Sequence, residues 1–257
     1  PAILFFIFGV FAGLVKSNLE IPQPIARFLS LYLLMALGLK GGFALHKSGF
    51  TIEIGLALGL AVFLAILVPL MGYMILRTRL NTFDAAAIAA TYGSVSAVTF
   101  ITATQVLSQY GVEYGGHMAA AMALMESPAI ILAILLANKA RAESTQNAQY
   151  PSLSKILHES FTDGAQLLLL GSMVVGLMSG DAWQKLMAPF SIDLFKGMLA
   201  FFLLDMGLMA AKNFEGLKGK PPITLFYAIL APLLHASIAL GLCKLLGLPL
   251  GDTVLLM

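Results

Sequence analysis

The sequence has little charge and a single cysteine. Charged residues make up 11% of the 257 residues, and the net charge is only +2. Soluble domains usually contain about 25% charged residues, so this chain departs far from that class. Cys243 alone cannot form a disulfide framework or a cysteine-based metal site within the chain. The small net charge also gives no indication of nucleic-acid binding.

Sequence patterns of several enzyme classes are missing as well. The chain contains no Gly-rich phosphate loop, no GxSxG elbow and no HExxH zinc motif. Two acids within apolar stretches, Glu126 and Asp205, could suggest an intramembrane aspartyl protease, but neither lies in the GxGD setting that such chemistry requires. The histidines show no metal-ligand spacing and are His46, His117, His158 and His235. We therefore expect a protein that is not an enzyme.

Apolar residues dominate the chain. They make up 59% of it, and the mean hydropathy is +0.91, which predicts an all-α polytopic membrane protein in the lipid bilayer of the cell inner (plasma) membrane. The chain begins at Pro1, inside an apolar run and without Met, so we expect it to be a piece of a longer protein. A polar linker is expected at 139–160, and 181–189 is expected to be a connection. Apolar spans are predicted at 2–15, 25–45, 52–76, 82–108, 117–137, 164–179, 194–211 and 223–246, and a further apolar run begins at 250.

The span at 82–108 is interrupted at its middle by Gly93-Ser94-Val95-Ser96. Glycine and serine weaken a helix through backbone freedom and competing side-chain hydrogen bonds. Backbone groups freed inside a membrane are tolerated only where they face protein or a water-filled cavity. Half-helix ends present free N–H groups on one side and free carbonyls on the other, which predicts a site for a small ion. An ordinary span that tolerates small residues for close packing is the alternative interpretation.

The two halves of the chain resemble each other. Leu37-Gly38-Leu39 matches Met206-Gly207-Leu208, and Phe83-Asp84 matches Gly251-Asp252 at nearly the same offset. The first unit contains five spans, an odd number, so the second unit is expected to be inverted in the membrane. We therefore predict a first repeat at 1–138 and a second at 161–257, each with a broken core helix. The second repeat is expected to be truncated, and its break to lie past Met257.

Lysine and arginine indicate the orientation of the spans. Ten of the 15 basic residues lie in or beside the odd-numbered connections and five in the even-numbered ones. Because cytoplasmic loops carry an excess of Lys and Arg, the N-terminus is predicted outside and the 139–160 linker in the cytoplasm.

Ionisable residues inside apolar spans are costly and therefore indicate function. Glu126 precedes Pro128, whose missing N–H frees the carbonyl of Leu124, and an acid beside a free carbonyl suits a cation such as sodium. A structural pair or a buried protonated acid is the alternative. Asp205 and Lys40 are candidates for a gate or for pairing with each other, and snorkelling is the alternative for Lys40. Hydroxyls that can gather beside the break, or else bond back to their own helix, are Thr91, Ser94, Ser96, Thr99 and Thr102.

Three segments resemble one known family. The run 91–100, TYGSVSAVTF, the run 122–138, MALMESPAIILAILLAN, and the run 231–242, APLLHASIALGL, are together similar to the sodium-dependent bicarbonate permease family, best known from cyanobacteria. The resemblance covers essentially the whole chain. It implies two inverted five-span repeats that form a gate domain and a core domain, with crossed broken helices four and nine. It also implies sodium and bicarbonate near 93–99 and Glu126, a homotrimer, and a small PII-like regulator on the cytoplasmic face.

The sequence thus favours a secondary transporter that moves sodium together with a small oxyanion, with bicarbonate as the first choice. A sodium/proton exchanger that uses Glu126 and a membrane sensor or scaffold read by a soluble partner are the alternatives. The residues predicted to bind the anion are Gly93, Ser94, Val95, Ser96 and Ala97. The predicted sodium ligands are Thr91, Ser96, Thr99 and Glu126.

Overall fold

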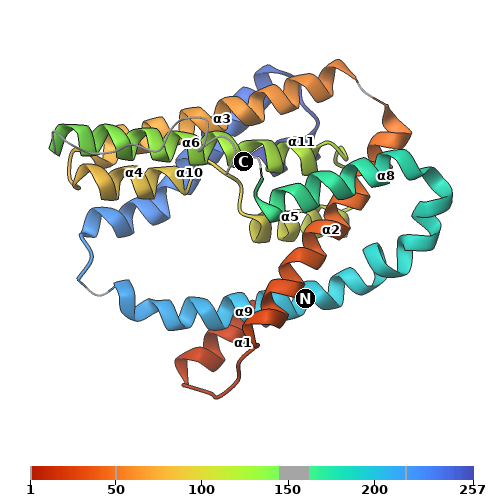
Figure 1. Ribbon diagram of the computed structural model, residues 1–257, viewed down its shortest axis with the longest axis horizontal. Helices are drawn as coiled ribbons and strands as arrows, with labels where there is room; N and C mark the ends of the chain where they lie inside the picture. The colour runs from red at the N-terminus through yellow and green to blue at the C-terminus, as the bar shows by residue number, and fades with distance from the viewer. Residues whose placement is uncertain (1, 50, 145–161, 218) are drawn as a thin grey trace.

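The computed structural model describes residues 2–49, 51–144, 162–217 and 219–257 (Figure 1). These residues form helices and no strand. A π-helix η1 (Pro189–Asp193) and a 3₁₀ helix η2 (Phe214–Leu217) flank α9. The α-helices are α1 (Ala2–Leu14), α2 (Gln23–Ser48), α3 (Ile52–Leu76), α4 (Thr82–Ala90), α5 (Ala97–Gln109), α6 (Met118–Ser144), α8 (Gly164–Ala188), α9 (Leu194–Asn213), α10 (Pro222–Leu245) and α11 (Leu250–Leu256).

The helices are long and apolar enough for a membrane protein. Within the described residues, four stretches qualify as membrane spans by length and composition: Gln23–Lys47, Ile52–Leu76, Ala182–Gly216 and Pro222–Leu245. Two shorter apolar helices accompany them, Ile3–Leu14 and Gly164–Gly180. The predicted all-α membrane class is therefore confirmed.

Local chemistry explains where several helices begin. Asn81 caps α4, because its side-chain oxygen accepts the Asp84 N–H at 2.8 Å while its amide donates to the Asp84 carboxylate at 2.7 Å. Asp163 caps α8 by accepting the N–H groups of Ala165 and Gln166. Pro222 occupies the first position of α10, where its missing N–H costs nothing.

Two expected boundaries were wrong. The stretch 181–189 was expected to be a connection, but it is helical almost throughout: α8 kinks at Gly180, which has a φ of 67°, and continues to Ala188. The glycine accommodates the left-handed backbone that redirects the chain. The helix α6 also continues to Ser144, into the expected linker, because Lys, Ala, Arg and Glu are good helix formers. The rest of that linker lies outside the described residues.

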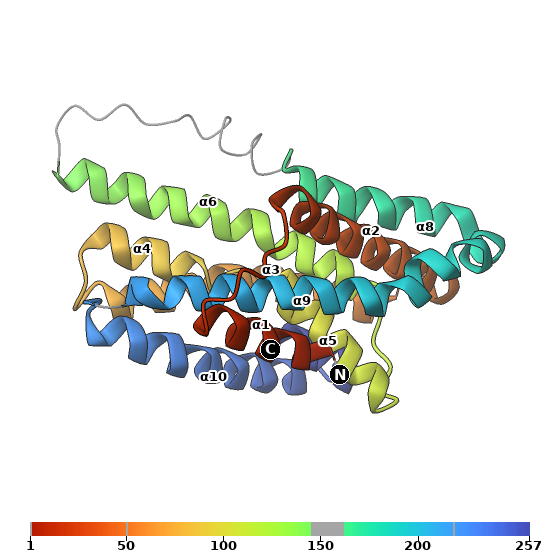
Figure 2. The same cartoon turned by 90° about the horizontal axis from the view of Figure 1, so that it is seen from below.

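The helices pack in two groups. One group consists of α1, α2, α8 and α9, in which α1 lies along α9 and α2 along α8 (Figures 1 and 2). The other contains α3, α4 and α6 in mutual contact, with α10 against α3 and α11 against α5 and α10. Contacts of α6 with α2 and α8 join the two groups.

Small residues allow the helix pairs of the first group to approach closely. In the pair α1 and α9, a Cβ placed on Gly9 would lie 2.3 Å from the Leu204 carbonyl oxygen, and Gly207 lies directly opposite. In the pair α2 and α8, a Cβ on Gly42 would lie 2.1 Å from the Met173 carbonyl oxygen, and Gly176 lies opposite. Close backbone approach of this kind is how helices associate in lipid, where apolar side chains gain nothing by leaving the solvent.

The two crossings use positions that correspond between the halves of the chain. Gly9 faces Gly207 in one crossing, while Ser172 faces Gly38 in the other. One turn further along, Gly13 faces Ala211, and Gly176 faces Gly42. The contact positions on α1 and their counterparts on α8 are separated by one constant number of residues. The contact positions on α2 and their counterparts on α9 are separated by a second constant number.

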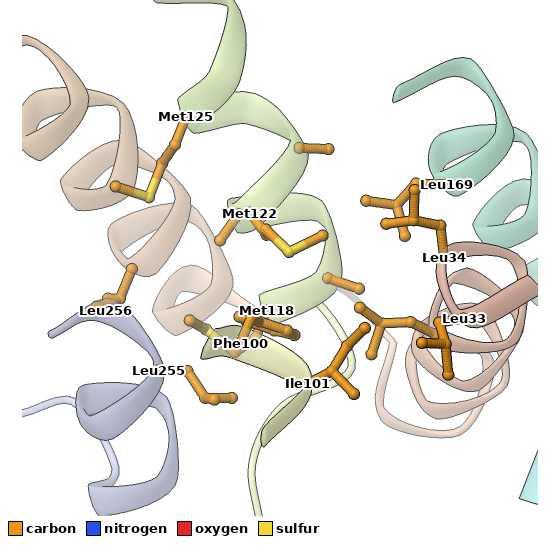
Figure 3. Packing of buried hydrophobic residues seen from close by; sticks show 14 of the residues in the cluster. Leu33, Leu34, Phe100, Ile101, Met118, Met122, Met125, Leu169, Leu255 and Leu256 are labelled. Atoms are coloured by element: carbon orange, nitrogen blue, oxygen red, sulfur yellow. The ribbon is translucent and has the colours of Figure 1, made fainter. Parts of the chain in front are cut away.

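The packed core lies where the two groups meet (Figure 3). Phe100 and Ile101 of α5 are 2% and 1% exposed, and Met118 of α6 is fully buried. They pack in one cluster with Leu33 of α2 and Leu255 of α11. Because the lipid is itself apolar, this core contributes close van der Waals packing rather than transfer out of water. It fixes α5, and with it the segment between α4 and α5.

Candidate functional site

The predicted break in the fourth span is confirmed. The helix α4 ends at Ala90, α5 begins at Ala97, and residues 91–96 are not helical. Two short turns close α4, in which Tyr92 N–H donates to the Ala89 carbonyl at 3.2 Å and Gly93 N–H donates to the Ala90 carbonyl at 3.0 Å. The local sequence thus determines where the helix stops.

The break leaves a run of backbone groups without partners. Among the described residues, the carbonyls from Thr91 to Ser94 accept no hydrogen bond, and the N–H groups from Ser94 to Thr99 donate none. The first hydrogen bond of α5 runs from Phe100 N–H to the Ser96 carbonyl at 2.9 Å, and the Ser96 side chain makes no cap. Backbone groups at membrane depth need partners, so this segment is suited to hold polar ligands.

Gly93 is the point at which the break packs against its neighbours. A Cβ on Gly93 would lie 2.4 Å from Cγ of Pro69 on α3 and 2.8 Å from Cβ of Ala129 on α6. Neither atom belongs to a flexible side chain that could move aside. The requirement for glycine here is therefore steric.

Each of the three long helices around the break contains a proline residue. They are Pro69 in α3, Pro128 in α6 and Pro232 in α10. Because Pro69 has no N–H, the carbonyl of Ala65 loses its usual donor one turn later. That carbonyl oxygen lies 3.0 Å from the position of a Cβ on Gly93. A freed carbonyl thus borders the break on α3, in addition to the Leu124 carbonyl predicted from Pro128.

A cavity of about 290 Å³ opens beside the break. It brings together five of the residues predicted from sequence, which are Thr91, Ser94, Val95, Ser96 and Thr99. Gly93 and Ala97 lie within the same segment but not on the cavity wall. The other lining residues are Leu64, Val68, Tyr92, Met125, Pro232, His235, Ala239, Leu256 and Met257.

The hydroxyl groups at the cavity are only partly engaged. Thr91 Oγ1 donates to the Ile88 carbonyl at 2.7 Å, which leaves its lone pairs available. Among the described residues, the hydroxyls of Ser96 and Thr99 make no hydrogen bond. Thr102, by contrast, bonds back to its own helix through the Val98 carbonyl at 2.8 Å and does not line the cavity.

Glu126 does not lie on the wall of this cavity. Its neighbour Met125 does, and Glu126 points elsewhere because successive residues of a helix differ by about 100° in direction. The charge that acts on Glu126 is the carboxylate of Asp163, the N-cap of α8. The sodium-binding role of Glu126 stays a prediction.

Lys40 and Asp205 lie in separate places, and no ion pair joins them. Lys40 Nζ lies 4.0 Å from the centre of the Phe195 ring, beside a cavity of about 190 Å³ between α2, α5 and α6. Asp205 lines a different cavity of about 630 Å³, together with the first turn of α2 and Lys212. The two residues are not paired with each other in the structure. A gating role for either residue stays a prediction.

Sequence reasoning missed His235. This residue of α10 lines the cavity at the break, is 7% exposed, and stacks edge to face on Tyr92 with ring centres 5.6 Å apart. Its position three residues after Pro232, inside an apolar span, was the available signal, because an ionisable side chain at membrane depth indicates function. Among the described residues no cluster of three potential metal-ligating side chains occurs.

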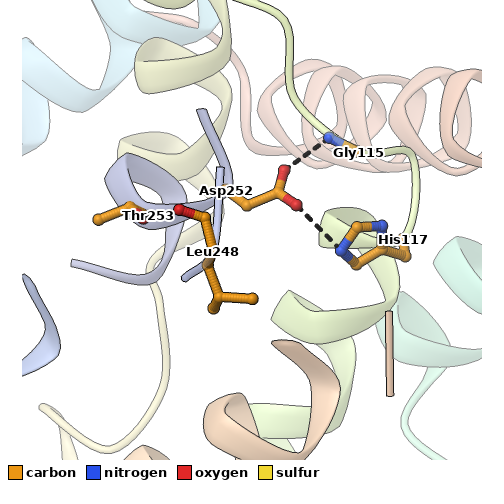
Figure 4. A network of polar contacts seen from close by, with 5 residues as sticks. All are labelled: Gly115, His117, Leu248, Asp252 and Thr253. Carbon is orange, nitrogen blue, oxygen red and sulfur yellow. Dashed lines mark hydrogen bonds and ion pairs between the residues drawn. The ribbon is translucent and has the colours of Figure 1, made fainter. Parts of the chain in front are cut away.

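The helix α11 reaches the cavity from the end opposite to α4. The start of α4 follows the C-terminal end of α3, whereas the start of α11 lies near Thr51 and Ile54 at the N-terminal end of α3. Both helices end at the cavity, at Thr91 and at Leu256 and Met257. Asp84 and Asp252 are each the third residue of their helix. Figure 4 shows Asp252 against Gly115 and His117.

A comparison with protein families places the whole chain in one of them. The model described as the Na+-dependent bicarbonate transporter superfamily matches residues 1–257. The chain belongs to this superfamily. The Na+-dependent bicarbonate transporter superfamily is a family of transporters and not of enzymes, so the resemblance drawn from the three sequence segments is confirmed. The comparison with curated proteins gave no match.

Membership in the Na+-dependent bicarbonate transporter superfamily supports transport of bicarbonate and dependence on sodium. It also agrees with the several apolar helices of the fold. The cavity at the break lies beside the unpaired backbone groups of this segment.

Proposed function

We propose that the protein is a secondary active transporter that carries sodium and bicarbonate together across the inner membrane by alternating access. The observation that carries this proposal is that, among the described residues, the carbonyls from Thr91 to Ser94 and the N–H groups from Ser94 to Thr99 are unpaired beside a cavity of about 290 Å³. A helix broken in this way inside a membrane exposes groups of both polarities within a few ångströms. Such a segment can bind a cation and an anion side by side.

Oxygen atoms on one side of the break form the sodium site in this proposal. Sodium is a hard cation and prefers oxygen ligands, as calcium and magnesium do. The hydroxyls of Thr91, Ser96 and Thr99 and the freed carbonyl of Ala65 supply such oxygens. Glu126, which follows the wall residue Met125 on α6, contributes negative charge from outside the cavity wall, as predicted from the sequence.

The N–H groups at the start of α5 form the anion site. Gly93, Ser94, Val95, Ser96 and Ala97 make up the segment, and the N-terminus of α5 carries the partial positive charge of a helix end. Sodium bound close by offsets the charge of the anion, so each ion improves the site for the other. That mutual stabilisation is the physical basis of coupled transport.

Relative movement of the two helix groups provides the alternating access. The group of α1, α2, α8 and α9 corresponds to the gate domain, and the group with the break corresponds to the core domain. The matched small-residue crossings of α1 with α9 and α2 with α8 support two inverted repeats related by a pseudo-twofold axis. The approach of α4 and α11 from opposite ends supports the same architecture.

Orientation, assembly and regulation complete the proposal. The N-terminus lies outside and the 139–160 linker in the cytoplasm, on the distribution of Lys and Arg. Two odd-numbered connections meet at one cavity, which Glu20 and Lys212 both line. Two even-numbered connections meet at another cavity, which Thr51 and Pro249 both line. The homotrimer and the PII-like cytoplasmic regulator follow from the family resemblance.

Uptake of labelled bicarbonate into proteoliposomes, with and without a sodium gradient, tests the proposed function. We expect sodium-dependent uptake and bicarbonate-dependent sodium uptake in a fixed ratio. Sodium uptake driven by a proton gradient without bicarbonate would indicate the exchanger instead. If the folded protein carries neither ion, the membrane sensor or scaffold is the remaining interpretation.

A further inference from the structure

His235 presents an unpaired nitrogen atom at the cavity beside the break. The residue is only 7% exposed. Among the described residues, its Nε2 has no hydrogen-bond partner. Pro232, His235 and Ala239 lie on one face of α10, and all three line the cavity. The imidazole therefore belongs to the cavity wall.

Aromatic packing holds the imidazole ring in place. Tyr92 meets it with ring centres 5.6 Å apart and planes at 71°, and Tyr227 meets it with ring centres 6.3 Å apart and planes at 69°. Tyr92 and Tyr227 also pack on each other at 5.2 Å. A ring fixed from two sides loses little conformational entropy when a ligand binds to it.

A buried polar atom without a partner is costly, and such atoms are rare in folded proteins. Tyr227 packs on the ring but does not line the cavity, and its hydroxyl lies against Gly72 of α3. The unpaired Nε2 of His235 at the wall of the cavity is explained if a polar ligand in the cavity supplies its missing hydrogen bond.

The chemistry of the cavity indicates which ligand this is. No Asp, Glu, Lys or Arg side chain of the described residues lines it, so the side chains that the ligand meets there are neutral. Bicarbonate carries an O–H donor as well as negatively charged oxygens that accept. A neutral imidazole nitrogen accepts from that O–H in one tautomer and donates to an oxygen in the other. Chloride and nitrate have no O–H and can use only the second mode.

We propose that Nε2 of His235 forms a hydrogen bond to the transported bicarbonate in the cavity beside the break, opposite the N–H groups at the start of α5. This inference rests on the proposed transport function and assigns to α10 a substrate-binding residue. It also supplies a reason for Tyr92 and Tyr227 to pack on the ring.

Three variants measured in proteoliposomes test the assignment. His235→Leu removes the nitrogen while keeping an apolar volume in the aromatic cluster, and we expect the KM for bicarbonate to rise about tenfold or more. His235→Gln restores a side-chain amide that can donate or accept, so its KM should return most of the way to the wild-type value. His46→Leu is the matched control, because His46 lies on α2 with Nδ1 2.8 Å from the Leu177 carbonyl oxygen, outside the cavity.

The sodium concentration for half-maximal uptake, measured at saturating bicarbonate, should stay within about twofold of wild type in all three variants. An unchanged KM in His235→Leu overturns the inference. So does an equal fall of kcat in His235→Leu and His235→Gln with no change in KM, which is what a purely structural role predicts. If His235→Leu does not fold, His235→Gln and His235→Asn decide, since Asn is too short to replace Nε2 and should show the raised KM alone. Lack of sodium-dependent uptake by the wild-type protein overturns the proposed transport function first.

Discussion

The carboxylate of Asp252 lies 3.2 Å from Nε2 of His117 and also accepts the Gly115 N–H at 2.6 Å (Figure 4). Both side chains are buried, at 4% and 6% exposure. This contact joins α11, near the end of the chain, to the connection that leads into α6. It fixes α11 at the end opposite to α4, so that the last residues of α11 reach the cavity at the break.

Removing this carboxylate should destabilise the fold. Asp252→Ala leaves the part-buried Gly115 N–H without its acceptor and removes the carboxylate that lies 3.2 Å from Nε2 of His117, which costs about 1.5–3 kcal/mol. We expect the melting temperature in detergent to fall by several degrees. Asp84→Ala is the control, because Asp84 has the equivalent position in α4 but is exposed. An equal fall of the melting temperature in both variants would show that the contacts of Asp252 with Gly115 and His117 do not stabilise the fold.

Gly93 should tolerate no side chain. Gly93→Ala forces a Cβ against Pro69 and Ala129, a strain of roughly 1–3 kcal/mol, and Gly93→Leu should abolish transport. In contrast, Gly59→Ala on α3 places its Cβ in open space and should leave uptake unchanged. Transport and thermal stability are measured on all three variants. Wild-type behaviour of Gly93→Leu would refute the close packing of the break.

The serine hydroxyls at the cavity should matter for transport and not for folding. Ser94→Ala and Ser96→Ala each remove one polar group without adding bulk, so expression and oligomeric state should hardly change. We expect each to lower transport about threefold to tenfold, the range for one hydrogen bond. Ser237→Ala is the matched control, since that exposed hydroxyl donates to the Leu233 carbonyl of its own helix. Full transport by the double variant at positions 94 and 96 would remove the hydroxyls from the site.

The sodium dependence of uptake decides the role of Glu126. Glu126→Gln preserves size and hydrogen-bonding capacity but removes a negative charge, so we expect a higher sodium concentration for half-maximal uptake. Asp163→Asn is the comparison, because it removes the neighbouring charge while an amide oxygen can still cap α8. Unchanged sodium dependence in Glu126→Gln would assign the acid to the contact between α6 and α8.

Labelling of introduced cysteines tests the orientation. Cys243 is buried, so an impermeant maleimide should give little background. A cysteine in place of Gln146 should react only from the cytoplasmic side, and one in place of the exposed Glu113 only from outside. Reaction of Gln146→Cys in intact cells would reverse the predicted topology.

The sequence alone determined the membrane class, most of the spans and the position of the break. The predicted third span coincides with α3, Ile52–Leu76, and the fourth stops within the Gly-Ser segment as expected. These features are local: span length follows from hydropathy, and the break follows from glycine and serine. The family also followed from sequence, through three segments whose similarity does not depend on knowing their contacts.

Only the tertiary structure decided which side chains meet at the cavity. Glu126 was predicted there, but Met125 lines the wall, while His235 arrives from a helix more than one hundred positions away in the chain. In a membrane protein the lipid-facing and buried sides of a helix are both apolar, so the sequence gives little indication of which way a helix is turned. The direction of each side chain is set by close packing between distant helices, such as Gly9 against Gly207 and Asp252 against His117.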